Sequence, residues 1–288
     1  MDAHPDDAQP VHIALDDRPL WGRIVVLWVM LALMGCMSGC GTLANGRGWG
    51  QDAFTNMRPS TIAQAAKRAF FDVGTLAPAA GAIVFAASGV DDDVADWASE
   101  HTPLFGSVER AQRTSDVLRD ALLIEMLASA LATPSGTKPQ EWTYAKAKGL
   151  GGELLALGAT IGVTDLLKTI TDRTRPDRSD SRSFPSGHAS GAFAAATLAN
   201  RNLKVLRLPP WAKQSLPVGN LVLASAVAWA RVEGERHFPS DVLAGAALGH
   251  FLSAFIHDAV LGLPDTFSVG IALFPEQHGG MVHLSFGF

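Results

Sequence analysis

The feature that most constrains this chain is a succession of long helical stretches, separated from one another by proline and glycine. The longest stretch runs from Glu141 to Thr171, and the stretch before it places leucine and methionine side chains at helical spacing. Turn residues such as Pro134-Ser135-Gly136 end one stretch before the next begins. The pattern predicts an all-α bundle, with central helices over residues 115–133, 141–171, 187–203, 216–232 and 239–261.

Two features of these helices bear on how they pack. In the last one, Gly245, Gly249 and Ser253 recur every four residues and predict one smooth face for close packing. Ionisable residues such as Glu153 and His250 interrupt the helices, so none is apolar over twenty residues. This favours a bundle with a water-exposed or interfacial surface over one that crosses the bilayer, and leaves the second arrangement open.

Composition excludes several classes of function. The 288 residues are 48% hydrophobic and 18% charged, which allows a sizeable core and argues against disorder. The net charge is −5 and there is no long basic run, so no nucleic-acid partner is expected. The two cysteines, Cys36 and Cys40, both lie near the N-terminus, so the main body has no disulfide framework and no cysteine-based metal site.

The N-terminal region resembles an export signal. Residues 24–34 form an unbroken apolar run, too short to span a bilayer but of the length of a signal-peptide core. Ser38 and Gly39 precede Cys40 as in the lipobox of bacterial lipoproteins, in which the cysteine is acylated and becomes the first residue. Cys36 is a second candidate, and an uncleaved anchor helix over residues 21–37 is the alternative to cleavage.

The C-terminal tail changes its period. Apolar residues alternate with smaller ones on both sides of a turn-rich segment that begins at Pro275. Residues 266–288 therefore predict a short C-terminal β-hairpin, expected to pack on the bundle. The chain thus divides into a signal peptide (1–39), a Gly-rich tether (40–59), a helical domain (60–264) and the hairpin segment (265–288).

Chemistry-bearing residues gather around one turn, Ser186-Gly187-His188, which opens the 187–203 helix. A helix N-terminus favours anions, because its unpaired N–H groups and the macrodipole point outward. Five further cationic, nucleophilic or acidic residues flank this turn along the chain: Lys168, Arg175, Arg231, His237 and Asp241. Two histidines, two arginines and a lysine around a helix start predict an oxyanion site.

The spacing of these residues resembles that of a known family. Lys168-x6-Arg175-Pro176, Pro185-Ser186-Gly187-His188 and Arg231-x5-His237-x3-Asp241 are similar, in order and spacing, to the three motifs of the PAP2 superfamily. That superfamily includes type 2 phosphatidic acid phosphatases, bacterial acid phosphatases and vanadium haloperoxidases. The resemblance implies a PAP2-type bundle of about six core helices over roughly residues 115–262. Ala230 departs from the family pattern, which has serine before the arginine.

Phosphoryl transfer asks a protein mainly to position the phosphate and to neutralise its oxygens. Arg175 and Arg231 suit bidentate contacts, Lys168 adds a point charge, and Ser186 with the Gly187 N–H adds neutral donors. We expect His237 to be the nucleophile and to form a phosphohistidine, with Asp241 orienting its ring. We expect His188 to protonate the leaving oxygen and then to activate water. No metal is required, because side chains supply the positive charge.

Three smaller features leave alternatives open. Asp91-Asp92-Asp93 favours a solvated helix start over a cation site. Arg173, Arg178 and Arg182 either widen a positive mouth or form solvated ion pairs with neighbouring aspartates; the second is slightly favoured. His250 and His257 share one helix, but without further ligands they do not predict a metal site.

The sequence therefore predicts a metal-independent phosphatase, tethered to the bacterial cell envelope by a lipid on Cys40 and facing the periplasm. The expected substrate is a lipid phosphate or diphosphate, such as phosphatidic acid, undecaprenyl diphosphate or a lipid A type molecule. The alternatives are a vanadate-dependent haloperoxidase, in which His237 would hold the vanadate, and a catalytically inactive structural lipoprotein. Vanadate is the cofactor only in the first alternative.

Overall fold

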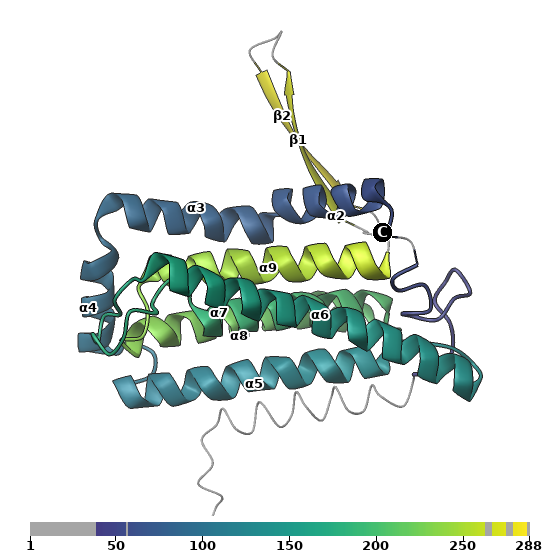
Figure 1. Cartoon of the computed structure of the whole chain (residues 1–288), viewed down its shortest axis with the longest axis horizontal. Helices are drawn as coiled ribbons and strands as arrows, with labels where there is room; N and C mark the ends of the chain where they lie inside the picture. The colour runs from purple at the N-terminus through teal and green to yellow at the C-terminus, as the bar shows by residue number, and fades with distance from the viewer. Residues whose placement is uncertain (1–38, 56, 263–266, 275–278, 287–288) are drawn as a thin grey trace, which may run out of the picture.

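The computed structural model describes residues 39–55, 57–262, 267–274 and 279–286. Within these ranges the chain forms eight helices followed by two strands (Figure 1). The helices are α2 (Pro59–Phe71), α3 (Val73–Ser88), α4 (Asp91–His101), α5 (Val108–Ala132), α6 (Pro139–Thr171), α7 (Gly187–Val205), α8 (Pro210–Glu233) and α9 (Pro239–Leu261). The predicted helical bundle is confirmed, and the predicted signal peptide lies outside the described residues.

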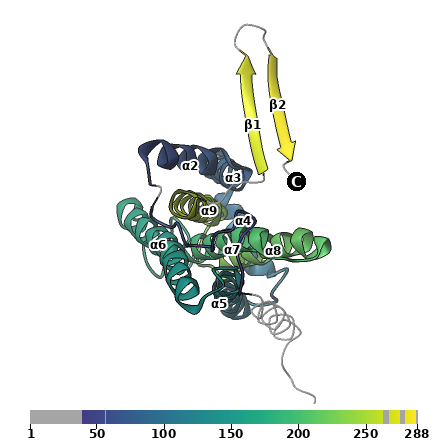
Figure 2. The same cartoon turned by 90° about the vertical axis from the view of Figure 1, so that its right-hand side faces the viewer.

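Helix α7 lies at the centre of the bundle, with α5, α6, α8 and α9 around it (Figure 2). Its buried side chains are mostly alanine, and small side chains let neighbouring helices approach from several directions. Leucine and methionine from α5, such as Leu122 and Met126, fill the space against this alanine-rich surface. Ser186 caps the helix, because its hydroxyl accepts a hydrogen bond from the Ala189 amide.

Two glycines of α9 set its distance from α7. A Cβ on Gly249 would lie 2.1 Å from the Ser190 carbonyl oxygen, and a Cβ on Gly245 would lie 2.5 Å from the Ser186 carbonyl oxygen. Neither position has room for a larger side chain, since the obstacle in both cases is backbone. The predicted smooth face of α9 is therefore confirmed at these two positions, and it brings the start of α7 against the start of α9.

The segment before α2 is packed against the bundle, which differs from the predicted tether. Trp49 is 0% exposed, and its ring lies where a Cβ on Gly149 of α6 would be. The Lys146 ammonium lies 5.0 Å from the centre of the same ring. Backbone hydrogen bonds between Gly41 and Gly136 hold the start of the segment at the α5–α6 connection. A large aromatic side chain anchors this stretch despite its many glycines.

The outside of the bundle is apolar. Among the described helices, α6, α8 and α9 are long and apolar enough to cross a membrane, and α2 with α3, bent by 52°, could act as one further span. Large hydrophobic side chains stand exposed along α6, for example Leu154, Ile161 and Ile170, and along α8 and α3. Apolar surface of this extent on a soluble monomer would be unusual. The ionisable residues that interrupt the apolar stretches of these helices lie inside the bundle: Glu153, Lys168 and His257 are buried.

Strands β1 (Phe267–Phe274) and β2 (Gly279–Phe286) follow the bundle and pair antiparallel, with Ile271 opposite Val282. Both views show this pair extending away from the helices (Figures 1 and 2), whereas the sequence favoured packing on the bundle. The pair has no part in the arrangement of residues described next.

Candidate active site

The predicted site residues converge at one end of the bundle, the end at which α4 lies (Figure 1). Lys168 is in the last turn of α6 and Arg231 in the last turn of α8. The turn at Ser186 begins α7, and Asp241 is in the first turn of α9. Helices that run in alternating directions thus bring two C-terminal ends and two N-terminal ends together, although their residues are far apart in sequence.

Hydrogen bonds between these chain segments fix their positions relative to one another. The Ser186 amide donates to the Asp241 carbonyl oxygen at 2.9 Å, which ties the start of α7 to the start of α9. The Lys168 ammonium donates to the Arg182 carbonyl oxygen at 2.6 Å, and its Cε lies 3.7 Å from where a Cβ on Gly187 would be. The Lys168 side chain therefore lies within ordinary van der Waals distance of the start of α7. The fold therefore brings the residues of the three motifs together at one end of the bundle.

His237 is the most enclosed member of the cluster, with 2% of its surface exposed. Its Nδ1 lies 2.7 Å from the Ser183 backbone carbonyl oxygen. A carbonyl oxygen only accepts hydrogen bonds, so Nδ1 carries the proton and Nε2 keeps its lone pair. Burial lowers the pKa of His237 well below its usual value, and the charges of Lys168 and Arg231 lower it further. The ring is therefore neutral at physiological pH, with a nucleophilic nitrogen.

Asp241 lies behind this histidine, but it does not make the predicted hydrogen bond to the ring. Its Oδ2 is 3.9 Å from His237 Nδ1, beyond hydrogen-bonding distance. The carboxylate instead accepts from the Ser183 hydroxyl, from the Phe238 amide at 2.9 Å and from Arg173 Nη1 at 2.6 Å. The orienting contact that the sequence assigned to Asp241 is made by the Ser183 carbonyl group in this structure.

Arg173 connects Asp241 to a distant part of the chain. Its Nη2 donates to Asp91 Oδ2 at 2.8 Å, and its guanidinium lies 4.1 Å from the centre of the Phe238 ring. Asp91 opens α4, as predicted, but it is buried rather than solvated, and it also accepts from the Ser240 amide at 2.9 Å. The favoured prediction of a solvated helix start therefore fails for Asp91. Arg173, whose side chain is 32% exposed, pairs with the buried carboxylates of Asp91 and Asp241 and not with aspartates of its own loop.

His188 faces the same space from the first turn of α7. Its Nε2 lies 2.6 Å from Asp116 Oδ1 and 2.8 Å from Arg119 Nη1. A carboxylate only accepts and a guanidinium only donates, so these contacts select opposite tautomers, and the shorter one puts the proton on Nε2. Burial, and then the charge of Arg231, lower the pKa of His188 to about 4, while Asp116 opposes this shift. Sequence reasoning missed Asp116 as a site residue, since it is part of no motif.

The two arginines of the cluster are held differently. Arg175 donates from Nε to Asp180 Oδ1 at 2.6 Å. Arg231 donates from Nη1 to the Ser115 hydroxyl at 3.1 Å, and it is buried. The Arg231 Nε–H is also buried and has no hydrogen-bond partner among the described residues. A buried N–H group without a partner is costly, and an oxyanion placed between these cations would satisfy it.

The remaining predicted residues lie elsewhere. Cys40 is exposed and lies near the start of α6, at the end of the bundle opposite to the cluster. His250 lies against Asp72 and Thr197, and His257 is buried beside Asp258. The part of the chain that the structure describes holds no group of three or more potential metal ligands.

Comparisons with known proteins identify the family of this chain. Residues 150–263 match the model of the PAP2 superfamily. The chain is 34% identical over 149 residues to the decaprenylphosphoryl-5-phosphoribose phosphatase of Mycobacterium tuberculosis, covering 49% of this chain and 71% of the relative. It is 32% identical over 127 residues to the lipid A 1-phosphatase of Porphyromonas gingivalis; that alignment covers 44% of this chain but only 27% of the longer relative.

A solved structure shows a weaker likeness. The transmembrane PAP2 type phosphatidylglycerolphosphate phosphatase from Bacillus subtilis superposes with a TM-score of 0.48 at 23% identity, covering 63% of this chain and 90% of that one. The family match at residues 150–263 contains Lys168, His188 and His237, the residues that the fold brings together. On the strength of this match and the extensive mycobacterial alignment, the chain belongs to the PAP2 superfamily.

Proposed function

We propose that this protein is a membrane-associated phosphatase that hydrolyses a phosphomonoester or diphosphate of a lipid without a metal ion. The observation that carries the proposal is the environment of His237. A neutral imidazole with a free lone pair is enclosed by Lys168, Arg175 and Arg231, whose charges all act on it. Cations in this arrangement bind a phosphoryl group and keep the attacking nitrogen unprotonated.

The proposed reaction has two steps. His237 Nε2 attacks the phosphorus atom, the bond to the leaving oxygen breaks, and protonated His188 donates a proton to that oxygen. The resulting phosphohistidine is then attacked by a water molecule, whose proton returns to His188, and inorganic phosphate leaves. Lys168, Arg175 and Arg231 hold the phosphoryl oxygens through both steps, with the Ser186 hydroxyl and the Gly187 amide as neutral donors.

His188 becomes an effective acid only when the substrate is bound. Without an anion its pKa is lowered to about 4, since burial and the charge of Arg231 disfavour the imidazolium. A bound phosphate places negative charge beside the ring and offsets the arginine, which raises the pKa toward the working range. We therefore propose that substrate binding itself charges His188, with Asp116 stabilising the imidazolium.

A lipid substrate fits the position of the site. The cluster lies at one end of helices whose sides are apolar, so a bundle in the bilayer would present it at the level of the lipid headgroups. Both relatives from Mycobacterium tuberculosis and Porphyromonas gingivalis carry names of enzymes that act on phosphorylated lipids. The substrate class that we propose includes phosphatidic acid, prenyl diphosphates and lipid A type molecules.

In a bundle that spans the membrane, the predicted lipid anchor on Cys40 and the predicted periplasmic site exclude each other. From Pro139, near Cys40, to Lys168 the α6 helix rises about 43 Å, more than the roughly 30 Å hydrocarbon core of a bilayer. If the bundle spans the membrane, Cys40 and the site face opposite sides. A periplasmic site then requires a cytoplasmic Cys40, which would not be acylated. We propose that the apolar bundle holds the protein in the membrane, and the lipid on Cys40 remains a prediction.

The function is tested by assaying the full chain in detergent, with a chelator, against p-nitrophenyl phosphate, phosphatidic acid and undecaprenyl diphosphate. We expect phosphate release by the wild type and none by His237→Ala. Equal release by both proteins would refute the proposal. Bromide oxidation that appears only with added vanadate would instead favour the haloperoxidase, and inactivity in every assay would favour a structural protein.

A further inference from the structure

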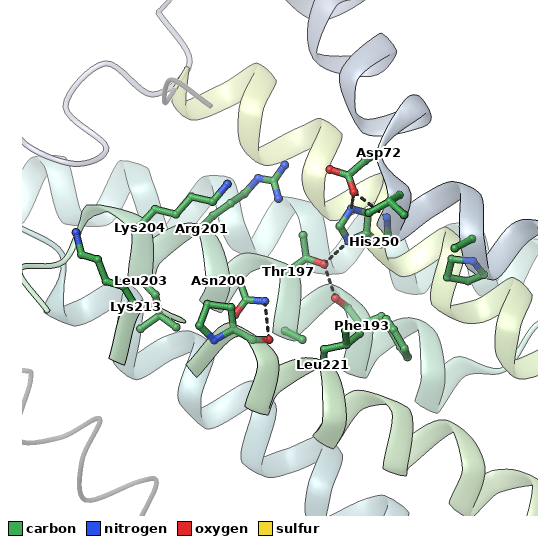
Figure 3. A pocket seen from close by; sticks show the side chains of 16 residues that line it. Asp72, Phe193, Thr197, Asn200, Arg201, Leu203, Lys204, Lys213, Leu221 and His250 are labelled. Atoms are coloured by element: carbon green, nitrogen blue, oxygen red, sulfur yellow. Dashed lines mark hydrogen bonds and ion pairs between the residues drawn. The ribbon is translucent and has the colours of Figure 1, made fainter. Parts of the chain in front are cut away.

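A second candidate binding region lies away from the phosphatase cluster. A cavity of about 810 Å³ opens between the α2–α3 junction, α7, α8 and α9 (Figure 3). None of the residues in the proposed catalytic cluster lines it. Its volume is within the range of sites that hold drug-sized or larger ligands.

The cavity follows the helices over about half the thickness of a bilayer. Along α7 its lining extends from Phe193 to Lys204, a rise of about 16 Å, against roughly 30 Å for the whole hydrocarbon core. Lys204 is at the end of α7 remote from His188. The cavity therefore lies mostly in the half of the bundle farther from the site, and Lys204 marks its outer end.

Most of the wall is apolar. Val73 and Ala77 line it from α3, Phe193 and Ala196 from α7, and Leu221 from α8. Among the described residues that line this apolar part, Asp72 is the one carboxylate, and neither lysine nor arginine is present. Its Oδ1 lies 3.1 Å from His250 Nε2, so the carboxylate has a partner in the histidine. A hydrocarbon chain suits such a wall, because its burial needs no polar partner.

The outer end of the cavity is cationic. Arg201, Lys204 and Lys213 line that end. In Figure 3 the two lysines lie on the side away from Asp72 and His250, with Arg201 between them and Asp72. Arg201 binds the Asp258 carboxylate through two hydrogen bonds, at 2.7 and 2.8 Å. Lys204 and Lys213 are both exposed, and they place two positive charges at the mouth. The two ends of the cavity therefore complement a molecule with an apolar tail and an anionic head.

We propose that this cavity binds an anionic phospholipid from the membrane leaflet opposite to the phosphatase site. Its phosphate group lies between Lys204 and Lys213, and one acyl chain runs inward between α7 and α8 past Ala196 to Phe193 and Leu221. Basic residues near the surface of a bilayer attract anionic lipids, and the apolar channel fixes the chain. The lipid is bound as a ligand and is not turned over, because the cavity contains none of the proposed catalytic groups.

The test measures lipid binding to the full chain by native mass spectrometry, with phosphatidylglycerol and phosphatidylcholine of identical acyl chains. We expect the wild type to bind phosphatidylglycerol at least tenfold more tightly than phosphatidylcholine. Lys204→Glu/Lys213→Glu should abolish this preference. The matched control Lys138→Glu/Lys148→Glu makes the same charge change at the same end of the bundle, outside the cavity, and should retain it.

A second variant tests the channel itself. Ala196→Trp fills the space between α7 and α8 and should weaken binding of phosphatidylglycerol at least tenfold, with helical content unchanged by circular dichroism. If Ala196→Trp fails to fold, the paired lysine variants still decide the proposal. Equal binding of both lipids by the wild type, or an unchanged preference in Lys204→Glu/Lys213→Glu, would overturn it. The measurement does not depend on turnover, so it stands apart from the proposed phosphatase activity.

Discussion

His237 Nδ1 donates its hydrogen bond to the backbone carbonyl oxygen of Ser183, at 2.7 Å, and not to a carboxylate. The same Ser183 donates its hydroxyl hydrogen to Asp241, which stands 3.9 Å from the imidazole. The serine therefore lies between the histidine and the acid and links them through its backbone and its side chain. A carbonyl group fixes the tautomer of the ring, and no side-chain substitution removes it.

This relationship predicts a modest effect for Asp241→Asn. The catalytic tautomer survives, because the Ser183 carbonyl group still holds Nδ1–H, while the stabilising negative charge is lost. We expect kcat to fall by about 10- to 100-fold, far less than the roughly 10⁴-fold loss that follows when an acid alone fixes the tautomer. His237→Ala should lose all measurable turnover. Equal losses in steady-state assays of the two variants would show that Asp241 acts directly on the ring.

Asp116 should control the pH dependence of the reaction. Its carboxylate raises the pKa of His188, against the lowering by burial and by Arg231. Asp116→Asn removes this stabilisation and lowers the pKa of His188. The imidazolium that protonates the leaving oxygen is then lost at a lower pH. The basic limb of the kcat–pH profile should move down by roughly 1 pH unit.

The neighbouring Asp120 provides a matched control for this experiment. It is exposed and pairs with Arg119, not with His188. Asp120→Asn should leave the basic limb in place. An unchanged profile in Asp116→Asn would mean that a group other than His188 supplies the proton.

Arg173 should matter for stability as well as for rate. It compensates two buried carboxylates, Asp91 and Asp241, and Arg173→Ala leaves both without their shared counter-charge. We expect a loss on the order of 3 kcal/mol in the free energy of unfolding, measured by denaturant titration in detergent. Arg182→Ala breaks only an exposed pair with Asp165 and should cost less than about 1 kcal/mol. Equal costs would contradict the buried network.

Much of the bundle could be predicted because helical periodicity and proline are local properties of the sequence. The turn at Ser186-Gly187-His188 is a helix start in the structure, as predicted, and Lys168 and Arg231 end their helices. The beginnings of helices are less predictable. Helix α8 starts at Pro210, before the predicted start at residue 216, because proline is well tolerated in a first turn.

The supporting contacts could not be predicted, because they join positions that share no local pattern. Asp116 contacts His188, which is 72 residues away in the sequence, and Asp91 contacts Ser240, which is 149 residues away. Trp49 is buried although it lies in a stretch rich in glycine, since the complementary surface is provided by Gly149 of α6. Only the folded backbone brings such partners together.

Gly249 should be intolerant of even the smallest side chain. In Gly249→Ala the added Cβ would lie 2.1 Å from the Ser190 carbonyl oxygen, so α7 and α9 must move apart. We expect a loss of about 1–3 kcal/mol in the free energy of unfolding. Gly158→Ala is the control, since a Cβ there meets nothing within 4 Å, and the better helix former should add up to about 1 kcal/mol. Matching thermal shifts would refute the close contact.

The orientation of the bundle can be tested through its cysteines. Cys36→Ser leaves Cys40 as the single thiol, at the end opposite to the site. Adding Cys40→Ser and Thr174→Cys places the single thiol in the exposed loop beside the site. A membrane-impermeant maleimide is then applied to intact and to lysed cells. If the bundle spans the membrane, we expect one thiol to react in intact cells and the other only after lysis.

The outcome also decides the lipid anchor. A Cys40 that reacts with maleimide carries no acyl chain, whereas an acylated Cys40 stays unreactive and incorporates radiolabelled palmitate. Reaction of both thiols in intact cells would contradict a spanning bundle, because α6 separates the two positions by more than the hydrocarbon thickness. An acylated Cys40 together with a Thr174→Cys thiol that reacts only after lysis would place the phosphatase site in the cytoplasm. The lipid substrates would then be those of the inner leaflet.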